Sequence, residues 1–125
     1  MSKVRAALKG FHSPDVDLES YSPAEPGCFM FLLQVFFGPE DRGVENSFDV
    51  IVCTPAWLEC EVGRRGILDG RHHLIVEKFD LDTIRAFLTE YAENATGDSW
   101  DEVAARLSRL GRWEFEDYQP FVDPS

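Results

Sequence analysis

The stretch FMFLLQVFF, residues 29–37, decides the fold that the sequence predicts. Its side chains are apolar at both alternating positions, with Gln34 as the one exception. A strand with one wet face alternates apolar and polar residues, whereas a strand covered on both faces is apolar throughout. We therefore expect residues 29–37 to form the central strand of a sheet, covered on both sides.

Segments on either side of this stretch predict its neighbours in the sheet. Residues 47–54, SFDVIVCT, are rich in β-branched side chains. They follow the loop GPEDRG, residues 38–43, closely enough to form a hairpin with the central strand. Apolar and basic side chains alternate over residues 3–9, which predicts a first strand with one wet face.

Two later segments predict further strands. HHLIVEKF, residues 72–79, has the composition of a strand, and RWEFEDY, residues 112–118, allows a closing strand by its alternation. In the closing strand, Trp113 and Phe115 share one face. We expect these two rings to anchor the strand to the core, while the glutamates between and after them face solvent or a partner.

Helix signals separate and follow these strands. Thr54 before Pro55 is typical of a cap with proline at the first helical position, which predicts a short helix of about two turns over residues 55–61. Apolar residues at helical spacing follow Asp80, whose carboxylate can cap the free amides.

A second helix is expected directly after the one that Asp80 begins. Ser99 and Glu102 have the spacing of a capping box, and an apolar stripe runs from Trp100 to Leu110. Gly111 stands where a left-handed terminator is expected.

The order of these elements predicts an α+β fold in a single domain, residues 1–125. We expect a mainly antiparallel sheet of four or five strands, with two consecutive helices packed on one face and a short helix after the third strand. Strand order cannot be deduced from the sequence.

Composition and charge limit the function. The net charge of −11 disfavours DNA, RNA and anionic lipid as partners and favours a basic protein. No segment has the pattern of a signal peptide or a membrane span, so we expect a cytoplasmic protein. Three cysteines without CxxC spacing indicate reduced thiols in packing roles.

Signatures of catalysis are weak. Phosphate-binding, dinucleotide-binding, HExxH and GxSxG motifs are missing from the sequence. His72 and His73 are adjacent and, on a strand, would point to opposite faces, so a zinc site would need one of them with Cys53 and Cys60. DxD pairs at 15–17 and 80–82 could bind magnesium but arise easily in an acidic chain. We expect no catalytic residue, no metal and no cofactor.

Uneven charge is the positive signal. Between Gly10 and Gly63 there are ten acidic residues and one basic residue, Arg42, and four more acids follow the last predicted helix. If the fold joins these segments, they form an acidic face edged with aromatic rings, which suits a basic protein partner. The candidate partner-binding residues are Asp15, Asp17, Glu19, Tyr21, Glu40, Asp41, Glu45, Glu114, Glu116, Asp117 and Tyr118.

Two alternatives to that face remain open. The acids can form an ordinary solvated surface with the aromatic rings turned inward. The closing segment can also be wholly structural, with the partner meeting the acidic loops at 13–25 and 38–45.

Several motifs together resemble the immunity protein 8 family of bacterial polymorphic-toxin systems. In order they are SPD with DLE, FLLQVFFGP, SFDVIVCTPAWL, RHHLIV, GDSWDEVAARLSRLG and WEFEDY, and they extend from about residue 8 to residue 119. The resemblance implies a small cytoplasmic protein that binds a cognate toxin domain encoded beside it and blocks that toxin without catalysis. It supplies no contact residues.

Two other function classes are kept beside this one. A small metal-dependent hydrolase would use His72 or His73 with scattered carboxylates, and a metal analysis would reveal it. A self-associating structural module would form dimers without another ligand. We expect a monomer or a weak homodimer.

Overall fold

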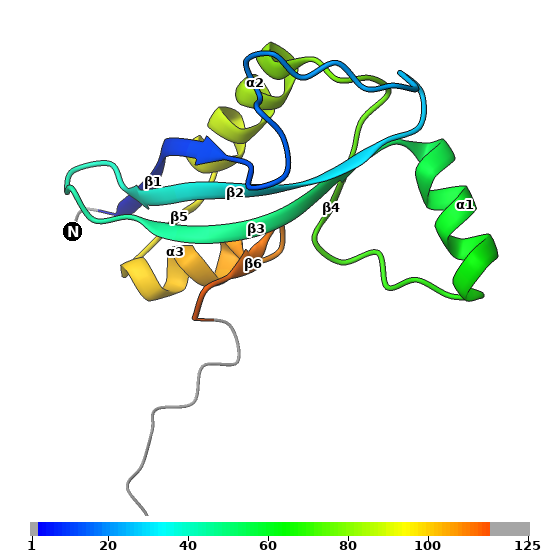
Figure 1. Ribbon diagram of the computed structural model, residues 1–125. Helices are drawn as coiled ribbons and strands as arrows, with labels where there is room; N and C mark the ends of the chain where they lie inside the picture. Colours follow the sequence, from blue (N-terminus) through cyan, green and yellow to red (C-terminus); the bar gives the residue numbers. More distant parts are fainter. Residues whose placement is uncertain (1–2, 116–125) are drawn as a thin grey trace, which may run out of the picture.

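The computed structural model of this chain describes residues 3–115, and within them it forms an α+β fold (Figure 1). The elements, in chain order, are β1 (Val4–His12), β2 (Met30–Pro39), β3 (Asn46–Cys53), α1 (Pro55–Arg65), β4 (His73–Ile75), α2 (Leu81–Glu93), β5 (Thr96–Gly97), α3 (Trp100–Leu107) and β6 (Arg112–Trp113).

The sheet has the order β4-β3-β2-β1-β5, and β6 pairs with β3 on the same outer edge as β4. β1, β2 and β3 form an antiparallel meander, as the hairpin pattern predicts, whereas β4 runs parallel to β3. The sheet has six strands among residues 3–115, and not the expected four or five. It is mixed through β4, but every other pairing is antiparallel, so the expectation of a mainly antiparallel sheet is confirmed.

The central strand β2 buries one face completely. Phe31, Leu33, Val35 and Phe37 are all 0% exposed, and three of them lie opposite buried residues of β3 in the antiparallel register. The residues between them, such as Leu32 and Gln34, stay partly exposed. The prediction of a strand covered on both sides is therefore correct for one face only.

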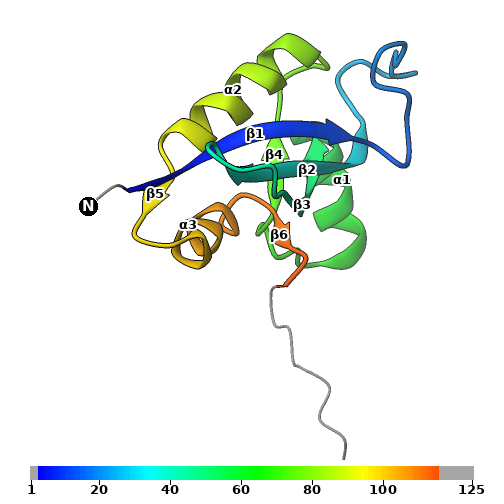
Figure 2. The ribbon, with the colours of Figure 1, turned by 90° about the vertical axis from the view of Figure 1, so that its left-hand side faces the viewer.

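Two helices complete the core. Ile84, Leu88 and Ala92 of α2 and the buried residues of α3 join the β2 and β3 side chains in one cluster. In both views α2 lies along β1 and α3 lies near β5 and β6 (Figures 1 and 2). The helices do not follow each other directly, because β5 lies between them and pairs with the start of β1.

Capping chemistry places the helix starts where the sequence predicts them. The side chains of Thr54, Asp80 and Ser99 each accept a hydrogen bond from a backbone amide of the first turn. Glu102 differs from a standard capping box, because its Oε2 accepts from the Asp98 amide, 3.2 Å away, and not from Ser99.

Helix ends were harder to predict. α1 passes through Gly63 and ends at Arg65, where Gly66 takes the left-handed conformation with φ of 84°, so it has about three turns and not two. None of its residues is buried. Gly111 is not left-handed; a Cβ there would lie 3.1 Å from the Asp49 carbonyl oxygen, so the glycine permits close packing on β3.

The two short late strands share the outer edge of β3. β4 covers Ile51–Cys53 and cannot continue, because β3 gives way to α1 after Cys53. β6 covers only Phe48 and Asp49. The strands expected over residues 72–79 and 112–118 are therefore three and two residues long.

Candidate functional site

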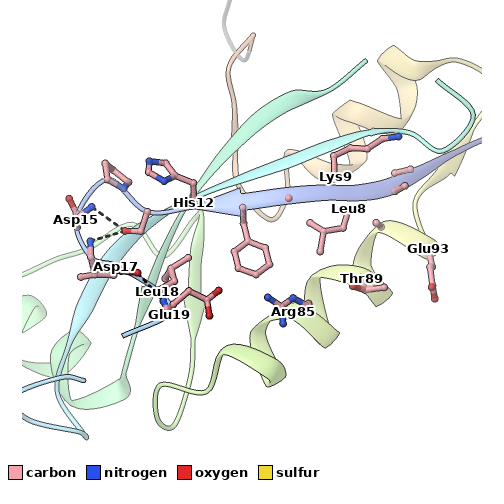
Figure 3. Close-up of a pocket in the computed structure, with 18 of the residues that line it drawn as sticks. Leu8, Lys9, His12, Asp15, Asp17, Leu18, Glu19, Arg85, Thr89 and Glu93 are labelled. Carbon is pink, nitrogen blue, oxygen red and sulfur yellow. Dashed lines mark hydrogen bonds between the residues drawn. The ribbon is translucent and has the colours of Figure 1, made fainter. Parts of the chain in front are cut away.

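A groove opens between β1, the turn after it and α2 (Figure 3). Its volume is about 1140 Å³. Residues 6–12 of β1 form one wall, residues 13–19 curve around one end, and Arg85, Thr89 and Glu93 of α2 form the opposite wall. Glu40, which directly follows β2, also lines the groove.

Side chains within the turn itself fix the shape of that end. The buried Ser13 hydroxyl accepts hydrogen bonds from the amides of Asp15 and Val16, at 3.1 and 3.3 Å. Asp17 Oδ1 accepts from the amide of Glu19 at 3.1 Å. Such local bonds are typical of Asx and Ser turns, and they fix the backbone of the turn from which Asp17 and Glu19 line the groove.

Asp15 has a structural contact besides its place in the groove. Its Oδ2 accepts a hydrogen bond of 2.8 Å from the Leu32 amide of β2. β1 pairs with β2 only as far as His12, opposite Gln34, so the carboxylate takes over the next position on that side of β2.

The charges of the groove are predominantly negative. Five carboxylates line it, and four of them were predicted as partner-binding residues: Asp15, Asp17, Glu19, Glu40 and, unpredicted, Glu93. Within residues 3–115, the side chains of Glu19, Glu40 and Glu93 make no hydrogen bond or ion pair. These three carboxylates are available to a partner.

Both cations of the groove already have contacts. The Arg85 guanidinium lies 5.3 Å from the centre of the Phe11 ring and 3.5 Å from a carboxylate oxygen of Asp82. The Lys9 Nζ donates to the Arg42 carbonyl oxygen at 2.9 Å. Neither cation neutralises the three available carboxylates.

Tyr21 lies in the core region, away from this groove. Its half-buried ring makes edge contacts with Phe29, Phe31 and Phe79, at 6.0, 5.4 and 5.0 Å between ring centres. Burial raises the pKa of its hydroxyl above the usual value. The ring supports the alternative in which aromatic side chains turn inward, and a contact with the partner stays a prediction.

The remaining predicted residues lie elsewhere. Asp41 and Glu45 are exposed in the connection between β2 and β3, where Asp41 pairs with Arg42 at 3.5 Å. Glu114 lies beside the outer edge of β3, and its Oε1 accepts from the Ser47 amide at 3.1 Å. Glu116, Asp117 and Tyr118 fall outside the described residues. The described residues of the expected acidic face are thus divided among the groove beside β1, the connection between β2 and β3, and the outer edge of β3.

Of the two rings expected to anchor the last segment to the core, Trp113 is the more buried. Trp113 is partly buried and stacks on Phe48 with ring centres 6.3 Å apart. Phe115 contacts Trp113 edge-on but stays 45% exposed.

The histidines and cysteines do not converge. Within residues 3–115, no three or more His, Cys, Asp or Glu side chains form a group that could hold a metal ion. His72 Nε2 lies 2.8 Å from the Ser108 carbonyl oxygen, and His73 Nδ1 lies 2.8 Å from that of Arg71. Burial raises the pKa of the Cys53 thiol to about 11, so it is not an activated nucleophile.

Sequence reasoning missed the α2 wall of the groove. Arg85, Thr89 and Glu93 are spaced four residues apart and therefore share one side of the helix, next to its buried stripe. That spacing was available in the sequence, but only the pairing of β1 at the sheet edge shows that this side faces a groove.

Comparison with known families gives one result that covers most of the chain. The family model for immunity protein 8 matches residues 6–118. Searches of curated proteins and of solved structures gave no significant match. In the described part of the chain, every helix is too short or too polar to cross a bilayer.

Proposed function

This chain belongs to the immunity protein 8 family, and on that premise we propose that it binds a cognate secreted bacterial toxin domain and neutralises it. The observation that carries the proposal is the extent of the family match, residues 6–118 of 125. The protein acts in the cytoplasm of the producing cell by binding alone, with no chemical step of its own.

The charge of the chain supports a basic toxin, such as a nuclease. A net charge of −11 repels nucleic acid and attracts a protein whose active cleft is built to hold phosphates. An acidic protein surface can occupy such a cleft in place of the phosphate backbone.

Electrostatic attraction also suits the task, because a toxin must be stopped before it acts. Complementary fields can raise association rate constants toward roughly 10⁸ M⁻¹s⁻¹ at low salt, well above the values for neutral partners. The groove lined by Glu19, Glu40 and Glu93 supplies carboxylates that no cation of residues 3–115 neutralises.

The test uses the toxin domain encoded beside this chain, purified in a catalytically inactive form. We expect a complex whose association slows steeply as salt rises, because ions screen charges beyond about 10 Å at 0.1 M ionic strength. Cells that produce the active toxin domain should survive only when this chain is co-expressed.

The two parts of the proposal fail separately in this test. Protection with an association rate that does not depend on salt would remove the basic toxin and the steering, but would leave the immunity function. No complex and no protection would contradict the immunity function itself.

A further inference from the structure

We propose that the open edge of β1 is the docking site for an extended, basic segment of the toxin domain. The segment adds a strand to the sheet in the groove between β1 and α2. This inference rests on the proposed function and specifies the surface that performs it.

The edge of β1 is covered only at its start. β5 pairs with Val4 and Arg5, and the Ala6 amide donates to the Ala95 carbonyl oxygen at 3.1 Å. From residue 7 to residue 12, no other strand of the described chain lies on this side of β1.

Strand geometry turns the free backbone groups toward the groove. In a strand, every second residue directs its N–H and C=O to the same neighbour, so the backbone of Leu8 points to the same side as that of Ala6. A row of unpaired backbone groups is a template for another strand. Main-chain hydrogen bonds of this kind provide affinity in complexes where a peptide extends a sheet.

The groove also offers apolar side chains that such a segment can contact. A bulge between Leu8 and Gly10 shifts the register, so that Leu8 lies opposite Phe37 and Phe11 lies opposite Val35, both on the core face. The side chain of Leu8 consequently lies between β1 and α2 (Figure 3), and the Phe11 ring lies under the Arg85 guanidinium of α2. Both residues line the groove. An added strand would place alternate side chains beside them on the same face of the sheet.

The charges select a basic occupant. Glu19 stands at one end of the groove and Glu93 on the α2 wall, and Glu40 lines it as well; none of the three pairs with a cation of the described chain. Lysine or arginine side chains of an extended segment would meet these carboxylates on both sides of the backbone pairing.

A second copy of this chain fits the edge less well. Two copies would bring net charges of −11 together, and each would present the same carboxylates to the other. A bulge also twists an edge strand and disfavours pairing with an identical edge.

Amide hydrogen exchange tests the docking directly. In the complex with the inactive toxin domain encoded beside this chain, we expect the Leu8 amide, which faces the open edge, to exchange at least about tenfold more slowly than in the free protein. The amides of α1 should exchange as before, because that helix lies at the far end of the sheet (Figure 1).

A pair of charge reversals tests the selection of a basic segment. Glu93→Lys should raise the Kd for the toxin domain roughly tenfold, mainly through slower association. Glu59→Lys makes the same change at an exposed position of α1 and should leave the Kd unaltered.

Each outcome decides a different part of the inference. A complex without slower exchange in β1 would overturn the docking and leave the proposed function standing. Slower exchange in the protein alone, increasing with its concentration, would make a second copy the occupant and overturn the basic segment. Failure of the toxin domain to bind would overturn both proposals.

Discussion

The outer edges of β3 and β1 differ in how far other strands cover them. The outer edge of β3 is covered by β4 at one end and by β6 at the other, and Glu114 accepts from the Ser47 amide beyond β6. The outer edge of β1 is covered by β5 at Val4 and Arg5 and then opens on the groove. One edge is closed by backbone pairing and packed rings, and the other is bordered by charge.

This difference has a physical meaning. An exposed strand edge favours aggregation, and proteins usually cover it, bend it or place charges beside it. The β3 edge uses cover, whereas the β1 edge uses a bulge and nearby charged residues, which discourage non-specific pairing and leave the backbone groups available. An edge left open in this way suits a specific partner, which is the basis of the docking proposal.

Breaking the closed edge should have the largest effect on stability. Trp113→Ala removes the ring that stacks on Phe48 and should lower the free energy of unfolding by about 3 kcal/mol through the cavity that it leaves. Phe115→Ala is the matched control. Its ring is 45% exposed, so we expect a loss below about 1 kcal/mol. Urea denaturation of both variants measures the difference, and equal losses would show that β6 does not close the edge through Trp113.

Glycine at position 111 should be the next most sensitive point of that edge. A Cβ there would lie 3.1 Å from the Asp49 carbonyl oxygen and 3.2 Å from Phe48 Cβ, so Gly111→Ala should cost about 1–2 kcal/mol. Gly63→Ala makes the same substitution inside α1, where no atom apart from the chain neighbours and the helix's own backbone lies within 4 Å of the new Cβ. The control should gain about 0.5–1 kcal/mol from helix propensity. Thermal unfolding distinguishes the two signs.

The closed edge also marks the limit of prediction from the sequence. The three long strands and the starts of α1, α2 and α3 could be predicted, because alternation and capping residues act locally. Parallel pairing of β4 with β3, and the sharing of one edge by β4 and β6, depend on long-range contacts that no local pattern records. The left-handed terminator predicted at Gly111 was wrong, because the close approach of this glycine to β3 is visible only in three dimensions.

The candidate site could likewise be predicted only as far as local sequence patterns allow. Charge asymmetry predicted carboxylates that now line the groove, including Asp17, Glu19 and Glu40. It did not predict that Glu114 lies at the opposite edge of the sheet, because the order of strands decides which acidic segments meet.

Charge reversal at the two edges compares them as docking surfaces. Glu19→Lys should raise the Kd for the toxin domain roughly tenfold with little change in stability, since its carboxylate has no partner among residues 3–115. Glu114→Lys should change the Kd less than about twofold and cost about 0.5 kcal/mol, because it loses an exposed hydrogen bond to the Ser47 amide. Surface plasmon resonance and denaturation give both quantities. A comparable loss of affinity for Glu114→Lys would return that residue to the contact surface.

The smallest effect is expected where β5 covers the start of β1. Lys3 Nζ and an oxygen of Asp98 lie 2.7 Å apart at an exposed site, so the pair links the first residue before β1 to the residue after β5. The hydrogen bond and charge of Lys3 lower the pKa of Asp98, and those of Asp98 raise the pKa of Lys3. A carboxyl whose pKa is lowered by folding stabilises the fold at pH values above its pKa in the unfolded chain. That contribution is lost as the pH falls through its pKa in the folded protein.

The link should therefore persist from about pH 4 to about pH 10 and weaken only outside that range, at the acid end through Asp98 and at the alkaline end through Lys3. Between pH 6 and pH 2.5, the NMR chemical shifts of the Thr96 and Gly97 amides should change as Asp98 is protonated, while those of the β2 amides stay constant. Asp98→Asn should abolish this pH dependence of the β5 amide shifts. It should also speed amide hydrogen exchange in β5 alone. If exchange accelerated along the whole of β1 in this variant, the boundary between its covered start and its open edge would not exist in solution.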